Sequence, residues 1–253
     1  MKRIVVPYHH AEPLRRLVEA FDADDAIVVS AGPAGAMVQR IHQQIAARVA
    51  QCDEPVIVAS GDCTTALPVV AGLQRRGLSP SVVWLDAHAD FETPQTTRSG
   101  DLCRLALAML IGRGGAALRE ASGLVALRGE SCVLAGARDV DAAEAGALTA
   151  AGVQRVDDLA ALAGAQLPPP PWYVHLDLDL IDPAELPPVR HPAPGGPAAE
   201  AIAAALRDLA ARGPIVAIGL GCTFTAAALR ADEPLAALRR LSATFSLSAT
   251  VSK

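Results

Sequence analysis

The chain has 253 residues, of which 51% are hydrophobic, and its formal net charge is -5. This length suits a single α/β domain over residues 1–253. No apolar run reaches the roughly 18 residues that span a bilayer, and an acidic chain without a basic stripe argues against a nucleic-acid partner. The five cysteines are odd in number and show no Cys-x-x-Cys spacing. We therefore expect a cytoplasmic protein without a disulfide framework.

Short apolar runs alternate with helical patterns along the whole chain. We expect strands at residues 2–8, 25–30, 55–60, 82–85, 130–137, 153–156 and 214–221, and another that begins at residue 173. We expect helices at residues 34–50, 64–76, 103–111, 142–151, 157–163, 197–211 and 226–241, and one that begins near Glu12 and Pro13. This alternation predicts a mostly parallel sheet between two helical layers, a three-layer α/β/α fold.

The first stretch with clear chemical character is Val-Val-Trp-Leu-Asp-Ala-His-Ala-Asp at residues 82–90. Its apolar run predicts a buried strand, and Asp86, His88 and Asp90 follow at a spacing of two. These side chains can converge at the carboxyl edge of the sheet, where open α/β sheets place their sites. A hydrogen-bonded strand end would explain one such triplet equally well.

A second stretch repeats the pattern at residues 173–182, Tyr-Val-His-Leu-Asp-Leu-Asp-Leu-Ile-Asp. Here an apolar strand ends in Asp177 and Asp179, and Asp182 precedes a proline. Burying so many acids is costly unless a cation neutralises them. The two stretches together offer a ligand set for two divalent metals, and its many carboxylates favour Mn(II) over Zn(II).

Each of three further features has two possible interpretations. Cys63 lies at a strand-to-helix turn, where it is either a small hydrophobic residue or a metal ligand. Asp141 either caps the helix that follows it or contacts a substrate. His9 and His10 follow the first strand, and a pair of this kind is either solvated or part of a substrate site.

Four motifs, in this order along the chain, resemble the ureohydrolase superfamily, which includes arginase, agmatinase and formiminoglutamase. They are Ser-Gly-Asp-Cys at residues 60–63, Asp-Ala-His-Ala-Asp at 86–90, Ser-Gly-Asp-Leu-Cys at 99–103 and Asp-Leu-Asp-Leu-Ile-Asp-Pro at 177–183. The resemblance extends over residues 57–196. It implies an arginase-like fold and two Mn(II) ions whose bridging hydroxide attacks a guanidinium-like carbon.

The same resemblance implies a role for individual residues. Asp86 and Asp177 would bridge the ions, Cys63 and Asp90 would complete one site, and His88 and Asp179 would complete the other. Candidates for catalytic proton transfer are Asp90, Cys103 and Glu92, with His9, His10 and His191 also open. Candidates for contact with an amino-acid substrate are Glu92, Thr97, Ser99, Asp141 and His191.

The departures from the family pattern suggest a particular substrate. Cys63 replaces a metal-binding histidine, Cys103 replaces the histidine that moves protons in arginase, and no acid pairs with the guanidinium near Thr223 or Phe224. A hydroxyguanidine is less basic than a guanidinium and needs less counter-charge. We therefore expect hydrolysis of Nω-hydroxy-L-arginine to hydroxyurea and L-ornithine, a reaction known in the family from antibiotic biosynthesis.

Two alternatives remain for the function, and one expectation concerns assembly. The substrate could be arginine, agmatine or another guanidino compound, or the chain could be an inactive arginase-like binding protein. Because the chain stops soon after its last predicted helix, at residues 241–253, we expect a monomer.

Overall fold

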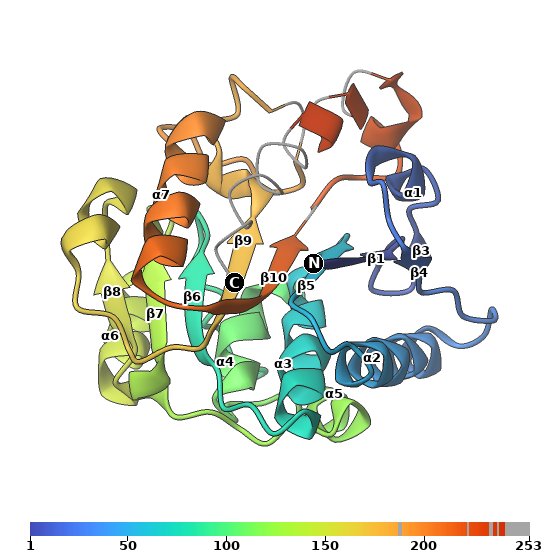
Figure 1. Cartoon of the computed structure of the whole chain (residues 1–253), viewed down its shortest axis with the longest axis horizontal. Coiled ribbons are helices and arrows are strands. Elements are labelled where there is room, and N and C mark those ends of the chain that lie inside the picture. Colours follow the sequence, from blue (N-terminus) through green and yellow to red (C-terminus); the bar gives the residue numbers. More distant parts are fainter. Residues whose placement is uncertain (187–188, 222, 233–234, 237, 241–253) are drawn as a thin grey trace.

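The central feature of the fold is a single parallel sheet. The computed structural model describes residues 1–186, 189–221, 223–232, 235–236 and 238–240. Within these residues eight strands pair in the order β4-β1-β5-β10-β9-β6-β7-β8, and every pairing is parallel (Figure 1). In that order the strands are Asp25–Ala26, Lys2–Val6, Val56–Ser60, Ile215–Gly221, Trp172–Asp177, Ser81–Leu85, Cys132–Ala135 and Gln154–Val156.

Helices cover both faces of this sheet. They are α1 Leu17–Ala20, α2 Ala34–Ala50, α3 Ala66–Arg75, α4 Ala106–Leu110, α5 Ala116–Ser122, α6 Ala142–Ala151 and α7 Ala199–Arg212. One core cluster joins the sheet to α2, α3 and α4, and a second joins the opposite face to α1 and α7. Figure 1 shows α2 to α5 gathered together, well apart from α7. The predicted three-layer α/β/α fold with a parallel sheet is therefore confirmed.

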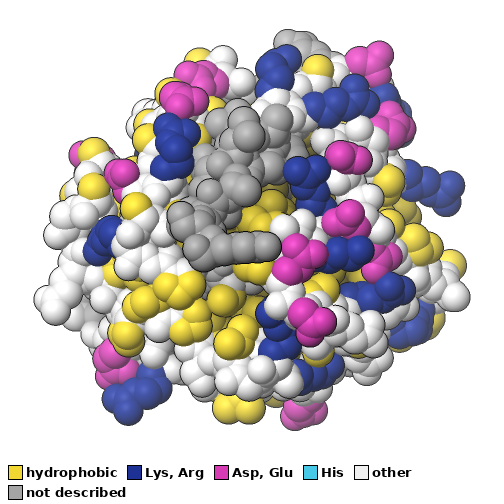
Figure 2. Space-filling model, in the orientation of Figure 1, with side chains coloured by type: hydrophobic (Ala, Val, Ile, Leu, Met, Phe, Trp, Pro, Cys, Tyr) yellow, Lys and Arg dark blue, Asp and Glu magenta, His cyan; other side chains and the backbone are white. Residues whose placement is uncertain are grey.

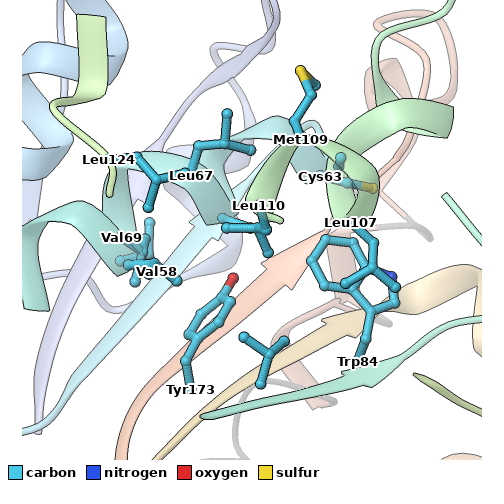
Figure 3. Close-up of a cluster of buried hydrophobic side chains, with 14 of the residues drawn as sticks. Val58, Cys63, Leu67, Val69, Trp84, Leu107, Met109, Leu110, Leu124 and Tyr173 are labelled. Atoms are coloured by element: carbon cyan, nitrogen blue, oxygen red, sulfur yellow. The ribbon is translucent and has the colours of Figure 1, made fainter. Parts of the chain in front are cut away.

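Side chains alternate between the two layers along each central strand, as the period of two requires. Val58, Trp84 and Tyr173 belong to the cluster under α3 and α4, which Figure 3 shows in close-up. Their neighbours Val83 and Val174 belong to the cluster on the α7 side. Both faces of the sheet are thus buried, which explains why these strands read as continuous apolar runs.

The strand order places a switch point in the middle of the sheet. The chain passes from β5 to β6 and leaves room between them, which β9 and β10 later fill. The chain continues from β6 to β7, whereas from neighbouring β9 it turns the other way to β10, so the loops after β6 and β9 leave in different directions. A crevice at such a point is where open α/β sheets bind ligands.

The local predictions for residues 12–13 and 25–30 were wrong. Instead of starting a helix, Glu12–Pro13 form strand β3, which pairs antiparallel with β2, Tyr8–His9. The strand expected at residues 25–30 is limited to Asp25–Ala26, because only these residues pair with β1. The turn after β5 is capped by Asp62, whose side chain accepts a hydrogen bond from the Thr64 backbone N–H at 3.0 Å.

Residues 241–253, on which the expectation of a monomer rests, lie outside the described residues. In the part of the chain that is described, we find no helix with both the length and the apolar character needed to cross a bilayer. Figure 2 shows Lys and Arg side chains beside Asp and Glu side chains over much of one face.

Candidate metal centre

Three loops at the carboxyl edge of the sheet bring acidic side chains together. Asp86 and His88 follow β6, Asp177 and Asp179 lie at the end of β9, and Cys63 follows β5. All five side chains are buried. Because parallel strands end at the same edge, segments more than 100 residues apart in the chain meet at one place.

The ligand atoms form two groups that share a carboxylate. In one group Asp86, His88 and Asp179 have atoms within 4.8 Å of one another, and His88 Nδ1 lies 3.1 Å from Asp179 Oδ2. In the other, Cys63, Asp86, His175 and Asp177 are equally close. Cys63 Sγ lies 2.9 Å from Asp177 Oδ2. Asp86 therefore stands between two adjacent candidate sites, as expected for a carboxylate that bridges two ions.

Local backbone bonds explain why the acids occur at a spacing of two. Asp86 Oδ1 accepts a hydrogen bond from the His88 N–H at 2.8 Å, and Asp177 Oδ1 accepts one from the Asp179 N–H at 2.9 Å. Each turn fixes one carboxylate and directs the next ligand to the same edge. Trp84 Nε1 also donates to Asp86 Oδ2 at 2.9 Å, which further orients the shared carboxylate.

Strand β10 leaves room for this arrangement through its glycines. A Cβ at Gly221 would lie 2.8 Å from Asp177 Oδ2, and a Cβ at Gly219 would lie 2.2 Å from the Tyr173 hydroxyl. A larger residue at either position would displace a side chain of β9. Just beyond β10, Thr223 donates to Asp177 Oδ1 at 3.2 Å.

The buried acids of the centre have too little positive charge from the protein around them. Burial, followed by the charges of neighbouring acids, raises the pKa of Asp90 and Asp177 well above the usual range and that of Asp179 to about 6. Although burial opposes it, Asp179 and Asp86 raise the pKa of His88 to about 11. Buried Asp90 Oδ2 and Asp179 Oδ1 have no hydrogen-bond partner among the described residues. These side chains fit divalent cations, which would supply the missing positive charge.

Asp90 lies beside the centre but in neither ligand group. Its backbone has φ 49°, a left-handed conformation that Asp adopts more readily than most residues. Its carbonyl oxygen accepts hydrogen bonds from the backbone N–H groups of Leu107 and Ala108, at 3.1 and 3.2 Å, and so ties this loop to α4. After burial, the charges of Asp86, Cys103 and Asp177 contribute to the raised pKa of its carboxylate.

Cys103 belongs to a second cluster, next to the centre. Its Sγ lies 3.9 Å from His10 Nε2, and its backbone N–H donates to Asp101 Oδ1 at 3.0 Å. Asp101 also contacts His10 at 3.4 Å and His191 at 3.2 Å. The ring centroids of His191 and His88 are 6.1 Å apart, so this cluster reaches the metal centre.

A cavity of about 350 Å³ lies beside the centre. Glu92 and Asp141 both line it, as do Arg104 and Asp139. Asp139 Oδ2 is 3.5 Å from His88 Nε2, which links the cavity to the candidate ligands. Glu92 forms an ion pair with Arg104 at 2.9 Å. Asp141 caps α6 by accepting a hydrogen bond from the Glu144 backbone N–H at 2.8 Å. It therefore has a structural role in addition to its place in the cavity lining.

Thr97 and Ser99 make local bonds outside that lining. Thr97 Oγ1 accepts from the Gly100 N–H, and Ser99 Oγ accepts from the Asp101 N–H, both at 3.1 Å. These bonds shape the polar loop that leads into Asp101. A substrate contact by either residue stays a prediction.

Sequence reasoning did not single out His175, His10 with Asp101, or Arg104. The signal for His175 was present, because it precedes Asp177 by two on the same strand and so shares its face. No comparable signal linked His10 to Asp101, since they are 91 residues apart and meet only in the folded chain.

The chain matches the Arginase family over residues 6–221. Two curated relatives are similar over part of their length. An N(omega)-hydroxy-L-arginine amidinohydrolase of Streptomyces lavendulae is 30% identical over 138 residues, or 53% of this chain and 49% of the relative. An arginase of Brevibacillus brevis is 31% identical over 153 residues, or 55% of this chain and 51% of the relative. The match thus spans about half the length of these relatives.

Solved structures share the fold over nearly the whole chain. A Bacillus subtilis arginase superposes with a TM-score of 0.79 at 20% identity, covering 100% of this chain and 99% of that one. An Entamoeba histolytica arginase in complex with L-ornithine gives a TM-score of 0.78 at 16% identity, with 96% and 97% covered. The family match, supported by the shared fold, shows that this chain belongs to the arginase family.

Proposed function

We propose that the chain is a binuclear manganese hydrolase that cleaves Nω-hydroxy-L-arginine to hydroxyurea and L-ornithine in the cytoplasm. The observation that carries this proposal is the shared carboxylate of Asp86, which belongs to two adjacent groups of buried ligand atoms. Similarity to a hydroxyarginine amidinohydrolase over about half its length supports the choice of substrate.

The proposed ligands are those expected from the motifs. Asp86 and Asp177 would hold both ions, Cys63 and Asp90 would complete one site, and His88 and Asp179 the other. Carboxylate oxygens dominate this set, which favours Mn(II). Two ions held there would lower the pKa of water and supply the nucleophile that attacks the guanidino carbon.

The cavity beside the centre suits an amino acid of this size. Arg98 and Arg104 line it and offer positive charge to a carboxylate, while Asp141 and Glu144 offer negative charge to an α-amino group. This pairing of both signs supports an amino-acid substrate over agmatine, which has no carboxylate. Glu92 would orient Arg104 through their ion pair.

The residues near the reacting end support a weakly basic substrate. Beyond β10 the chain offers Thr223, which bonds to Asp177, and Phe224, which is fully buried. Neither side chain supplies a carboxylate for a guanidinium. For proton transfer we propose Cys103, which lies 3.9 Å from His10, and Asp90, whose Oδ2 has no hydrogen-bond partner among the described residues.

An assay with three substrates tests the proposal. The purified protein is loaded with Mn(II), and ornithine release is measured from hydroxyarginine and from arginine, and urea release from agmatine. Ornithine from hydroxyarginine, at least tenfold faster than from arginine, is the expected result. A comparable rate of ornithine release from arginine would contradict hydroxyarginine as the preferred substrate. If the protein binds metal but releases neither ornithine nor urea from any of the three compounds, an inactive binding protein would be favoured.

A further inference from the structure

His175 is the one donor in the two ligand groups that the proposed ligand set does not use. Its side chain is 1% exposed, and its Nε2 has no hydrogen-bond partner among the described residues. A buried imidazole nitrogen without a partner is costly and calls for an explanation. One ring nitrogen of His175 lies within 4.8 Å of the donor atoms of Cys63, Asp86 and Asp177.

The sheet register places His175 directly below the acids. His175 of β9 pairs with Trp84 of β6, and two residues further along each segment lie Asp177, at the end of β9, and Asp86, just after the end of β6. Residues two apart in a strand share a face. His175 therefore forms the floor of the centre on the side where Cys63 enters from the turn after β5.

Two aromatic neighbours fix the orientation of the ring. Trp84 stacks on His175 with centroids 3.7 Å apart and an interplanar angle of 20°. The Tyr173 hydroxyl lies 3.2 Å from His175 Nδ1. When Nδ1 carries the proton and donates it to Tyr173, Nε2 keeps its lone pair for a metal, which is the arrangement typical of metal-binding histidines.

We propose that His175 is a metal ligand, and that the half of the centre around Cys63 is a mixed site of sulfur, nitrogen and oxygen. This inference rests on the proposed binuclear centre but changes the metal expected in one half. A thiolate with an imidazole suits Zn(II), Co(II) or Fe(II), whereas the half around His88 keeps a harder donor set that suits Mn(II). The two halves of the centre are therefore expected to differ in metal preference.

Cobalt titration tests this inference without any substrate. Co(II) bound to a thiolate gives a charge-transfer absorption, so the Cys63 half can be followed by absorbance while total cobalt is measured by elemental analysis. The wild type is expected to bind two ions and to show this band. Cys63→Ser is expected to lose the band, which confirms that the band reports on this half.

The decisive variant is His175→Gln, with His42→Gln as its matched control. His42 is also a buried imidazole, but it bonds to Ser122 and Thr64. His175→Gln is expected to weaken cobalt binding at least tenfold in the half around Cys63, called the thiolate half below. The affinity of the half around His88 should stay unchanged. The same variant should lower the ratio of Zn(II) to Mn(II) affinity at the thiolate half. His42→Gln should change neither.

A second variant keeps the test decisive if His175→Gln does not fold. Tyr173→Phe leaves the ligand in place but removes the partner of Nδ1, and loss of such a partner weakens metal binding roughly 10- to 100-fold. An unchanged affinity of the thiolate half in either folded variant would overturn the inference. A shifted cobalt affinity in a protein that cleaves no guanidino compound would uphold it and refute the proposed function instead.

Discussion

Two neighbouring clusters of similar composition behave in opposite ways. The candidate metal centre around Asp86 and Asp177 holds carboxylates that repel one another and oxygens without hydrogen-bond partners among the described residues. In the cluster around Asp101 the charges are matched, since Asp101 lies between His10 and His191. Composition alone, with His, Cys and Asp in both, would suggest two metal sites.

The pKa shifts express the same contrast. Burial and neighbouring acids raise the pKa of Asp177, whereas hydrogen bonds from His10 and His191 hold the pKa of Asp101 below its usual range. Burial opposes a charged His10, yet Asp62, Asp101 and Cys103 raise its pKa to about 11. One cluster lacks matching positive charge, and the other carries its own. Four experiments would break or sharpen this distinction.

The largest effect is expected from removing the shared ligand. Asp86→Asn should abolish tight binding of both ions and lower hydrolysis by roughly 10³-fold or more, because several kcal/mol of metal stabilisation are lost. Elemental analysis after dialysis and the ornithine assay measure the two effects. Asp101→Asn is the matched control and should keep both ions. Loss of metal in the Asp101 variant would mean that the two clusters are not distinct.

The metal-free protein should respond with opposite signs to two conservative substitutions. Asp177→Asn should raise the melting temperature by a few degrees, because it removes a carboxyl that is repelled by its neighbours. Asp101→Asn should lower it by several degrees, because it removes the carboxylate that His10 and His191 share, at a cost of about 1–3 kcal/mol. Thermal melts in a chelator provide the measurement, and shifts of the same sign would contradict the distinction.

The charge on His10 should be visible as a dependence of stability on pH. Its folded pKa lies above its unfolded value of about 6.5, so the stability it contributes is present below pH 6.5 and is lost as the pH rises towards 11. Urea unfolding of the metal-free wild type between pH 6.5 and 10 should therefore show a steeper loss than His10→Gln. The difference is at most about 1.4 kcal/mol per pH unit. Parallel curves would show that His10 is not held charged by its neighbours.

The smallest effect concerns an acid outside both clusters. Asp141→Asn keeps a good N-cap for α6, so the melting temperature should hardly change. If Asp141 also receives the α-amino group of the substrate, KM should rise about tenfold while kcat stays similar. Asp141→Ala should lose both functions and about 1 kcal/mol of stability. An unchanged KM in the Asn variant would leave Asp141 with its capping role alone.

The sequence by itself determined the parallel sheet and the acids at its edge. Apolar runs that end in Asp86 and Asp177 encode a strand, a turn and a candidate ligand within a few residues. Such short local patterns can be recognised in the sequence without knowledge of the tertiary structure. The hairpin at residues 8–13 escaped this approach, because a proline after an acidic residue also suits the start of a helix.

Only the tertiary structure decided which of these side chains act together. His175 became a candidate ligand because the register of β9 against β6 and the turn after β5 bring its imidazole near Cys63. Asp101 became part of a charged network because His10 approaches it across 91 residues of sequence. Strand register and loop proximity depend on contacts between distant segments, which no local pattern of residues specifies.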